Sequence, residues 1–506
     1  MTRADRIGLI LAGLALVASA IVTERVFERI PHLEDEIAYV WQARLAAQGR
    51  LTLPTPPHPN SYLVPFVVDY DGQRFGKYPP GWPAALSLGV RLGVRWLVNP
   101  LLAALGVWLT YRLGQKVFDE KVGLLAAALT LTSPFFLMNS ASLLSHPLGL
   151  ASSGIFVLGW LDAAEEGASW RRWAASVAAA LALGLLILTR PLTAVGVCFP
   201  FVWHGLYRFG RGSHQLRGRL AVFCAIVVAL ASLYPLWQYA VSGNATLNPY
   251  TLWWPYDRIG FGPGVGVTKT GHHLAQAVAN TGISLWAGVN DLFGWGPLSA
   301  LFLPLGAWAA RRTPRALLLA SVFGSLVLAY MAYWIGAWLF GPRYYYEGLF
   351  SLTILSAAGI VWLSRKLLPR WRVALGGGVA LLLAVNLLYY TPLRLQGLFG
   401  LYTIRRASQA PFLSAEAQAL TPALVIVHSE RWMFYGGLLD LQDPQMTTPF
   451  VFAWSNDPAQ DAALAADFPD RAVYHYYPDE PYHFYTAPRQ ADAEDAGGHP
   501  TPSQQP

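Results

Sequence analysis

The chain has 506 residues, of which 54% are hydrophobic and only 13% are charged. Soluble domains carry roughly 25% charged residues, so this composition excludes a soluble protein and predicts one that crosses a membrane several times. The net charge of +7 hides an asymmetry, because residues 392–506 carry −7 and the first 391 residues carry +14. On a membrane protein this basic total indicates cytoplasmic loops and anionic lipid, and no stacking-aromatic or basic-arm motif argues for nucleic acid.

The first apolar run and the cysteines narrow the class further. Ile7–Thr23 follows Arg3 and Arg6 and lacks a small-residue cleavage site, which predicts a signal anchor that stays in the protein. The two cysteines, Cys198 and Cys224, both lie inside apolar runs. The sequence therefore predicts neither a disulfide framework nor a C-x-x-C metal or redox motif.

After the first run, Pro31–Gly49 begins with three consecutive acids, Glu34, Asp35 and Glu36, at the expected edge of the bilayer. Unpaired charge is costly there and is usually kept for a task. Apolar residues recur behind the acids at helical spacing, which predicts a short amphipathic helix lying in the interface. Two interpretations stay open: the acids cap this helix and complement its dipole, or they carry chemistry.

The first external loop, residues 27–95, holds the next motif. Asp71-Gly72 between extended residues predicts a hairpin turn. Lys77 stands directly before Tyr-Pro-Pro, and the rigid proline pair would hold it just outside the membrane. A lone interfacial lysine is more often a snorkelling anchor than a binding residue, and both interpretations remain open.

Pro80–Val94 is a doubtful span, because it is short, opens with Pro-Gly-Trp-Pro and contains Arg91. Counting it as a span would place Arg112, Lys116 and Lys121 outside and invert every later loop. The positive-inside rule therefore predicts an interfacial helix that does not cross. The same rule predicts a cytoplasmic N-terminus and an external C-terminus, and the expected location is the plasma (inner) membrane.

A helix needs about 20 mainly apolar residues to cross the hydrocarbon, and about eleven runs fit this requirement. The predicted spans are Ile7–Thr23, Trp96–Tyr111, Val122–Asn139, Pro147–Leu161, Trp173–Thr189, Pro191–Tyr207, Leu220–Ala240, Leu292–Ala310, Ala316–Phe340, Leu349–Leu363 and Val373–Leu393. The uncharged stretch Val122–Leu161 is too long for one helix and is predicted to turn at Ser140–Pro147. The expected fold is an all-α polytopic membrane protein with interfacial helices in the first external loop.

The second large external loop, residues 241–291, carries Trp253 and Trp254, a glycine-rich stretch and the adjacent pair His272 and His273. The glycines predict a flexible cover, since no strand–turn–helix context supports a phosphate loop. The tryptophans suit stacking on sugar faces, although interface anchoring is their commoner role. The histidines are candidate metal or acceptor ligands, although two exposed loop histidines are more often neither.

Arg343 opens a late span on the predicted outer face, where the positive-inside rule discourages arginine. Three tyrosines, including Tyr345, and then Glu347 follow it. A binding role for Arg343 therefore competes with an aromatic belt in which Glu347 is simply its partner.

Beyond the last span, Ala423–Ser429, Phe450–Trp454 and Ala472–Tyr477 have the pattern of short strands, and Pro458–Asp467 that of a short helix. These elements predict a small external α/β domain over residues 392–486. The final residues, 487–506, are rich in Pro, Ala, Asp, Gln and Gly and are predicted to be disordered.

Several motifs in the first external loop carry a family resemblance. They are Asp35-Glu36, Tyr39, Ala43-Arg44, Gly49 and Lys77-Tyr78-Pro79-Pro80 before a sunken helix. Together they resemble the GT-C glycosyltransferases, nearest to the branch of bacterial aminoarabinose transferases and protein mannosyltransferase-like enzymes. The resemblance covers roughly residues 1–365 and implies a GT-C-like transmembrane domain over residues 1–391.

The resemblance implies an inverting glycosyltransferase that moves a sugar from a polyprenyl-phosphate carrier to a lipid, glycan or protein acceptor on the outer face. It implies Asp35 as the catalytic carboxylate, Glu36 as its catalytic neighbour and Lys77 as the lysine near the donor phosphate. The other expected phosphate- or substrate-binding residues are Arg343, Tyr345, Arg190, His146, His32, Arg74 and Arg258. His146 stands where relatives often have aspartate and Arg190 where many have lysine, which leaves the role of a divalent metal open.

Two other classes compete with a transferase. A transporter or flippase of a lipid-linked glycan usually keeps ionisable residues near the membrane midplane and shows repeated halves. Here the spans are almost free of charge and no internal repeat is visible, which favours chemistry at the membrane surface. A membrane scaffold acting through its C-terminal segment is the third interpretation.

Overall fold

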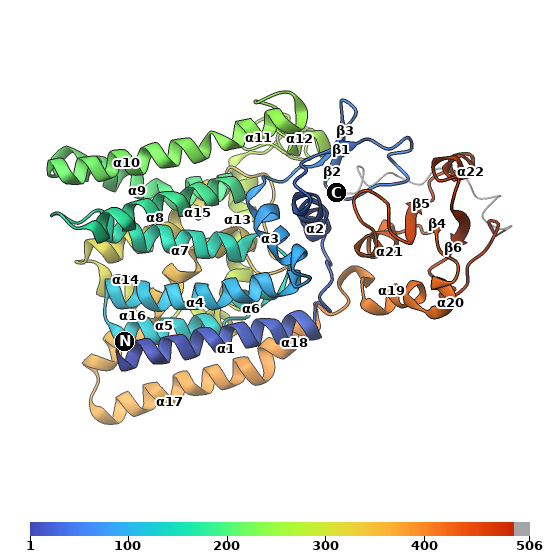
Figure 1. The fold of residues 1–506 in the computed structure, drawn as a ribbon. Coiled ribbons are helices and arrows are strands. Elements are labelled where there is room, and N and C mark those ends of the chain that lie inside the picture. Colours follow the sequence, from blue (N-terminus) through green and yellow to red (C-terminus); the bar gives the residue numbers. More distant parts are fainter. Residues whose placement is uncertain (490–506) are drawn as a thin grey trace.

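A computed structural model of the chain describes residues 1–489, so the tail predicted to be disordered over 487–506 lies outside the described residues from position 490 onward. Most of the described chain is a bundle of helices whose axes run side by side (Figure 1). The bundle helices are α1 (Arg3–Arg25), α4 (Val98–Val117), α5 (Glu120–Leu131), α6 (Pro134–Ala141), α7 (His146–Ala163), α8 (Trp170–Thr189), α9 (Pro191–Arg211), α10 (His214–Ala231), α11 (Leu233–Ser242), α13 (Leu274–Phe293), α14 (Leu303–Ala310), α15 (Pro314–Tyr330), α16 (Leu349–Lys366), α17 (Pro369–Val385) and α18 (Thr391–Gln396).

Small residues let neighbouring helices of the bundle approach closely. A Cβ atom added at Gly114 would lie 2.7 Å from Gly123 Cα, so α4 and α5 touch along their backbones. Close packing of this kind holds membrane helices together, because lipid supplies no hydrophobic driving force between them.

The uncharged stretch between α4 and α8 is broken twice. The predicted turn lies between α6 and α7, at residues 142–145. A second break, not predicted from the sequence, separates α5 from α6 and bends the pair by 61°. Pro134 explains this break, because a proline has no N–H to continue the α5 hydrogen-bond ladder but suits the first position of α6, where Ser133 caps the helix.

Five helices of the described chain are long and apolar enough to cross a bilayer, or up to seven if each of two bent pairs counts as one span. Each run predicted from sequence lies at least partly on a helix. Several of these helices are shorter or more polar than a typical span; α9, for example, carries Arg208 and Arg211 in its last turn. Length and composition therefore support an all-helical membrane domain but do not confirm the predicted count of about eleven spans.

The structure differs from the sequence analysis around the second large loop. The span predicted over Leu292–Ala310 is replaced by α13, which begins at Leu274, and α14, with a bend of 85° between them. Gly294, at φ +68°, ends α13 in the left-handed conformation that favours glycine. The polar residues of α13 made its first part resemble a loop in the sequence. The irregular segment between α11 and α13 is therefore shorter than predicted, and it contains α12 (Tyr250–Trp253).

The first large loop, residues 27–95, forms α2 (Glu34–Ala47), the strands β1 (Leu53–Pro54), β2 (Val67–Tyr70) and β3 (Gln73–Gly76), and α3 (Gly81–Arg91). The strands make an antiparallel sheet in the order β1-β3-β2. The hairpin predicted at Asp71-Gly72 is confirmed, with both residues at positive φ as a two-residue turn requires. α3 lies tightly against the end of α8, because a Cβ atom at Gly81 would lie 2.8 Å from the Leu188 carbonyl oxygen.

The C-terminal segment contains α19 (Arg406–Leu413), α20 (Ala415–Gln418), β4 (Ala423–Val427), α21 (Trp432–Gly436), β5 (Phe450–Trp454), α22 (Pro458–Asp467) and β6 (Ala472–Tyr476). The three strands pair in parallel in the order β5-β4-β6. All three predicted strands and the predicted helix are therefore confirmed.

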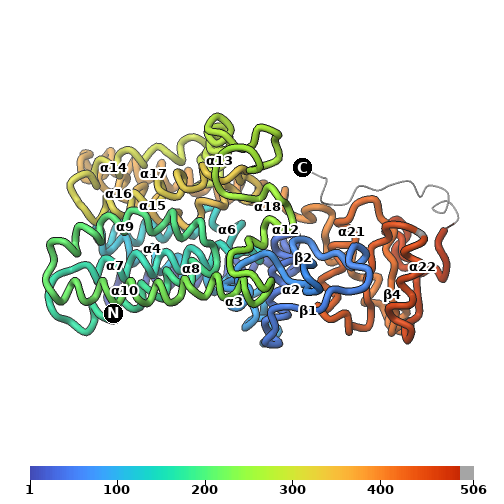
Figure 2. The backbone as a smooth tube through the Cα atoms, turned by 90° about the horizontal axis from the view of Figure 1, so that it is seen from above, coloured from blue at the N-terminus to red at the C-terminus, as the bar shows by residue number. Residues whose placement is uncertain are grey.

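The C-terminal segment packs on the first large loop rather than standing apart. Trp41 and Leu45 of α2 share an apolar core with Phe412 and Phe452. Asp440 accepts hydrogen bonds from Arg44 of α2 and from Arg95, at 3.0 Å and 2.5 Å. Figure 2 shows the result from above: α2, β1 and β2 lie between the bundle and the C-terminal elements β4 and α22.

Candidate active site

Asp35 lies in the first turn of α2, at the end of the bundle where the first loop and the C-terminal segment meet. Its Oδ1 accepts a hydrogen bond of 2.5 Å from the Tyr78 hydroxyl, and its Oδ2 lies 3.4 Å from Arg343 NH2. Burial raises the pKa of Asp35, but Arg343, Tyr78 and Lys77 more than offset burial and lower the pKa below its ordinary value of 3.8. The carboxylate is therefore ionised at neutral pH, and its side chain keeps 24% of its surface open to a ligand.

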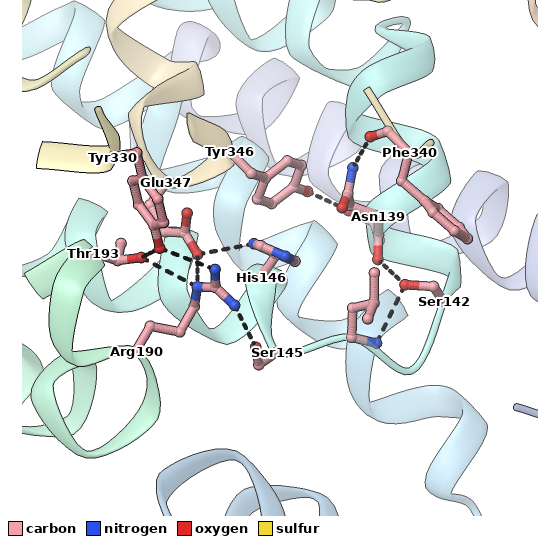
Figure 3. Close-up of polar contacts among 12 residues, drawn as sticks. Asn139, Ser142, Ser145, His146, Arg190, Thr193, Tyr330, Phe340, Tyr346 and Glu347 are labelled. Atoms are coloured by element: carbon pink, nitrogen blue, oxygen red, sulfur yellow. Dashed lines mark hydrogen bonds and ion pairs between the residues drawn. The ribbon is translucent and has the colours of Figure 1, made fainter. Parts of the chain in front are cut away.

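Arg343 reaches Asp35 from the other end of the sequence. It is the first residue of a short 3-10 helix, η3 (Arg343–Gly348), that leads into α16. The Asn139 side chain of α6 donates a hydrogen bond of 2.8 Å to the Phe340 carbonyl, which holds the turn before Arg343 against the bundle (Figure 3). Gly341, at φ +68°, packs on the Phe135 ring, so that turn has little freedom to move.

Lys77 lies in a cage of aromatic rings. Its Nζ is 3.7 Å from the centroid of Phe66, 4.8 Å from Trp254 and 5.1 Å from Tyr250. The side chain is only 3% exposed, so Lys77 is not the snorkelling surface anchor that the sequence left open. Burial lowers the pKa of Lys77 below its ordinary value, while Asp257 and Asp35 act in the opposite direction.

Asp257 is the buried partner of Lys77, and the sequence pattern did not predict it. Its Oδ2 lies 3.4 Å from Lys77 Nζ, and its Oδ1 accepts hydrogen bonds from the Tyr333 hydroxyl at 2.8 Å and Trp334 Nε1 at 3.1 Å. A buried charge needs such partners, because an isolated ion in a low-dielectric interior is very costly. The available signal was a lone acid after a run of tryptophan, proline and tyrosine.

Arg190 and His146 meet at a third buried acid, Glu347 (Figure 3). Glu347 Oε1 lies 3.1 Å from Arg190 Nε and 3.2 Å from His146 Nδ1. Arg190 also donates to the Ser145 and Tyr330 hydroxyls, both at 3.1 Å. Glu347 therefore pairs with Arg190. The aromatic-belt interpretation had made it the partner of Arg343 instead.

Glu36 faces away from this cluster. Its two carboxylate oxygens accept backbone N–H groups of His32 at 2.8 Å, Leu33 at 3.0 Å and Leu143 at 2.6 Å. It thus caps α2 and ties that helix to the turn between α6 and α7. The capping interpretation of the acidic triplet describes Glu36, whereas Asp35 is the acid that faces the cations.

Glu34 is a half-buried carboxylate beside Asp35 that was named in the triplet but not given a role. Burial and then the charge of Asp35 raise the pKa of Glu34 to about 7. A carboxyl group with this pKa exchanges protons near neutral pH, which is a property of functional sites.

The remaining expected site residues lie elsewhere. Arg74 pairs with Asp69 across the hairpin at 2.7 Å, and His32 packs on Phe27 with its Nδ1 2.9 Å from the Ile30 carbonyl. Arg258 is exposed and donates to the Pro255 carbonyl at 3.1 Å. The Tyr345 ring lies against Phe323 and Tyr330 inside the bundle. The structure therefore does not bring Arg74, His32, Arg258 or Tyr345 to the Asp35 cluster.

The histidine pair does not form a common site. His272 is buried, stacks on Phe261 and places Nε2 2.9 Å from the Met331 carbonyl. His273 is exposed and caps α13 by accepting the Gln276 backbone N–H. Within residues 1–489, no group of three or more His, Cys, Asp or Glu side chains is arranged to hold a metal ion.

Comparison with known proteins agrees with this architecture. Residues 79–239 match the model of the dolichyl-phosphate-mannose-protein mannosyltransferase family. ArnT from Cupriavidus metallidurans in the apo state superposes with a TM-score of 0.59 at 15% identity, over 92% of this chain and 88% of that one. The same protein bound to undecaprenyl phosphate superposes with a TM-score of 0.57 at 17% identity, over 94% and 96%.

The apo oligosaccharyltransferase of Archaeoglobus fulgidus superposes with a TM-score of 0.50 at 13% identity, over 84% of this chain and 63% of that one. A search of curated proteins by sequence found no match. The fold is that of the GT-C superfamily of membrane glycosyltransferases, and the resemblance drawn from the sequence motifs is confirmed.

Proposed function

We propose that this chain is an inverting glycosyltransferase that moves a sugar from a polyprenyl-phosphate-linked donor to an acceptor hydroxyl. The observation that carries the proposal is the position of Asp35, an ionised carboxylate within 3.4 Å of the Arg343 guanidinium and at the same end of the bundle as the buried Lys77. The undecaprenyl phosphate bound to ArnT, which shares this fold, supports a lipid phosphate as the group that these cations meet.

The chemistry requires a base and cations at the same place. A hydroxyl is a weak nucleophile, so Asp35 accepts its proton as the acceptor oxygen attacks the anomeric carbon. The new bond forms between that oxygen and the anomeric carbon, while the bond from the anomeric carbon to the phosphate oxygen breaks. The electron pair leaves with the polyprenyl phosphate, and attack from the opposite face inverts the configuration.

Arg343 and Lys77 stabilise the phosphate as its negative charge grows. Arginine offers two N–H groups in a plane that matches two phosphate oxygens, and lysine offers a point charge. Both cations are held by neighbouring side chains before a ligand arrives, so little reorganisation is needed during the reaction. We assign Arg190, one layer deeper and anchored on Glu347, to holding this end of the bundle in shape.

We propose the outer face of the cell's plasma membrane as the place of reaction and a cell-envelope lipid, glycan or protein as the acceptor. The three basic clusters Arg208–Arg219, Arg311–Arg315 and Arg365–Arg372 join helix ends opposite the Asp35 cluster, and the positive-inside rule places such clusters in the cytoplasm. In this proposal residues 1–391 form the transferase domain, and the segment 392–486 is external and supports α2.

The test is complementation of a deletion strain, read by mass spectrometry of its cell-envelope glycans. The wild-type chain and Asp71→Asn should restore a sugar modification, because Asp71 is exposed at a hairpin tip where asparagine is equally suitable. Asp35→Asn should lose the modification while the purified variant still binds undecaprenyl phosphate. Full restoration by Asp35→Asn would remove Asp35 as the base.

A further inference from the structure

A cavity of about 590 Å³ lies at the end of the bundle opposite the Asp35 cluster. Its walls come from the last turns of α4, α7 and α9 and from the beginning of α15. α7 joins the two ends directly, since it begins at His146 and carries Leu161 of the cavity in its last turn. An 18-residue helix spans about 27 Å at 1.5 Å per residue, so the cavity and the candidate active site are nearly a bilayer core apart.

The cavity is apolar on one side and charged on the other. Val117, Leu161 and Leu318 supply apolar walls, next to two arginines and two glutamates. Arg315 NH2 lies 2.7 Å from Glu165, and Arg208 NH2 lies 3.2 Å from Glu166. A volume between roughly 300 and 1,000 Å³ with few, placed polar groups is typical of small-molecule sites.

Arg208 lines the cavity and 29% of its side chain is exposed, so it is accessible to a ligand there. His204 stands one turn before it and accepts a hydrogen bond of 3.0 Å at Nδ1 from Trp160 Nε1. Tryptophan is only a donor, so a neutral His204 carries its proton on Nε2 and offers a second donor in the cavity.

We propose that this cavity binds the phosphoethanolamine headgroup of a membrane phospholipid. The phosphate accepts hydrogen bonds from Arg208, Arg315 and His204, and the primary ammonium donates to Glu165 and Glu166. The acyl chains lie along the apolar wall. Basic pockets between membrane helices on the cytoplasmic side bind the phosphates of lipid headgroups.

The balance of charges selects this headgroup over the two other common ones. An anionic headgroup such as phosphatidylglycerol would draw Arg208 and Arg315 away from the two glutamates and bring no cation in exchange. Among residues 1–489, Glu165 would keep only Arg172, at 3.5 Å, and Glu166 only Ser213, whose hydroxyl lies at 2.7 Å. A phosphocholine headgroup has no N–H to donate, and quaternary ammonium groups are recognised by aromatic cages. The cavity lining within the described chain contains no phenylalanine, tyrosine or tryptophan.

The experiment is native mass spectrometry of the full chain in detergent, titrated separately with phosphatidylethanolamine, phosphatidylglycerol, phosphatidylcholine and undecaprenyl phosphate. Arg208→Gln and Arg315→Gln should weaken phosphatidylethanolamine binding by about tenfold or more, because each removes a charge-assisted hydrogen bond. The matched control is Arg312→Gln, an exposed arginine of the same connection that does not line the cavity.

Two further variants keep the proposal falsifiable. Glu166→Gln should weaken phosphatidylethanolamine while leaving phosphatidylglycerol unchanged, since only the former carries an ammonium. Lys77→Met should lose undecaprenyl phosphate and retain phosphatidylethanolamine, which separates this cavity from the proposed active site. Equal phosphatidylethanolamine binding by all cavity variants, or tighter binding of phosphatidylglycerol that the same variants abolish, would overturn the proposal.

Discussion

Replacing Asp257 with asparagine tests how the buried Lys77 keeps its positive charge. The Asp257 side chain is 1% exposed and the Lys77 side chain 3%, and Asp257 Oδ2 lies 3.4 Å from Lys77 Nζ. Asparagine keeps a carbonyl oxygen for the Tyr333 hydroxyl and Trp334 Nε1, so the loop should stay in place. The substitution therefore removes a charge with little change of shape.

The magnitude follows from the distance between the charges. At 3.4 Å and an effective dielectric constant of about 20, the attraction is roughly 5 kcal/mol. A buried ammonium that loses this partner sheds its proton rather than remain unpaired. Burial already lowers the pKa of Lys77, and Asp257 is foremost among the groups that raise it, so removing Asp257 must lower the pKa further. The proton is then lost at a lower pH than in the wild type.

The assay is binding of undecaprenyl phosphate to the solubilised full chain from about pH 6 to about pH 9. At each pH the dissociation constant of the variant is divided by that of the wild type, so that the titration of the phosphate itself cancels. Because the ammonium is lost as pH rises through the lowered pKa, the variant should bind about 10- to 100-fold more weakly at the alkaline end. The two affinities should converge as the pH falls and Lys77 regains its proton.

The matched control is Asp291→Asn, which removes another buried carboxylate, 4% exposed and 3.1 Å from Arg394. A guanidinium stays protonated throughout this range, so the control should lose stability without any pH-dependent loss of phosphate affinity. An Asp257→Asn variant that binds undecaprenyl phosphate like the wild type at every pH would refute the reasoning.

Three further variants probe the scaffold around Asp35. Glu36→Gln should lower the free energy of unfolding by about 2 kcal/mol in a thermal melt. The carboxylate accepts three backbone N–H groups on two oxygens, whereas the glutamine amide has only one oxygen and cannot accept all three. Asp440→Asn should raise hydrogen exchange in α2 at neutral pH. Burial raises the pKa of wild-type Asp440, but Arg95 and Arg44 lower it below its ordinary value of 3.8. The wild-type contact should therefore weaken only as the pH falls through that lowered pKa. Gly81→Ala should cost about 1–3 kcal/mol because its Cβ meets backbone, whereas Gly13→Ala, with nothing within 4 Å, should be neutral or stabilising.

The elements of the fold were predictable where local chemistry decides them. The Asp71-Gly72 turn, the strands of the C-terminal sheet and the break after Ser140 follow from short-range patterns. The beginning of α13 was not predictable, because its polar residues contact segments that are distant in the sequence. The packing of the C-terminal segment on α2 was also invisible, since Asp440 and Arg44 are almost four hundred residues apart.

The sequence named Asp35, Lys77 and Arg343 as candidate site residues, but it did not indicate that Asp35 pairs with Arg343 or that Lys77 pairs with Asp257. Asp257 and Arg258 are adjacent, and one is buried while the other is exposed. Composition cannot tell which of two neighbours faces inward on an irregular loop. The role of Arg74 was predictable, because a two-residue hairpin turn at Asp71-Gly72 places Asp69 directly opposite it.

The network also resolves a tension in using Asp35 as a base. A helix N-terminus and the Arg343 guanidinium both favour its ionised form, which makes it a weak base. Without a ligand, Arg343 is paired with Asp35 and Lys77 with Asp257. In the proposed reaction, a donor phosphate that draws Arg343 toward itself would neutralise the charge holding the pKa of Asp35 down, so that pKa would rise as the donor binds. Asp35 would then be a competent base only with a donor in place, and the same exchange of partners would bring the phosphate next to the cation proposed to stabilise its departure.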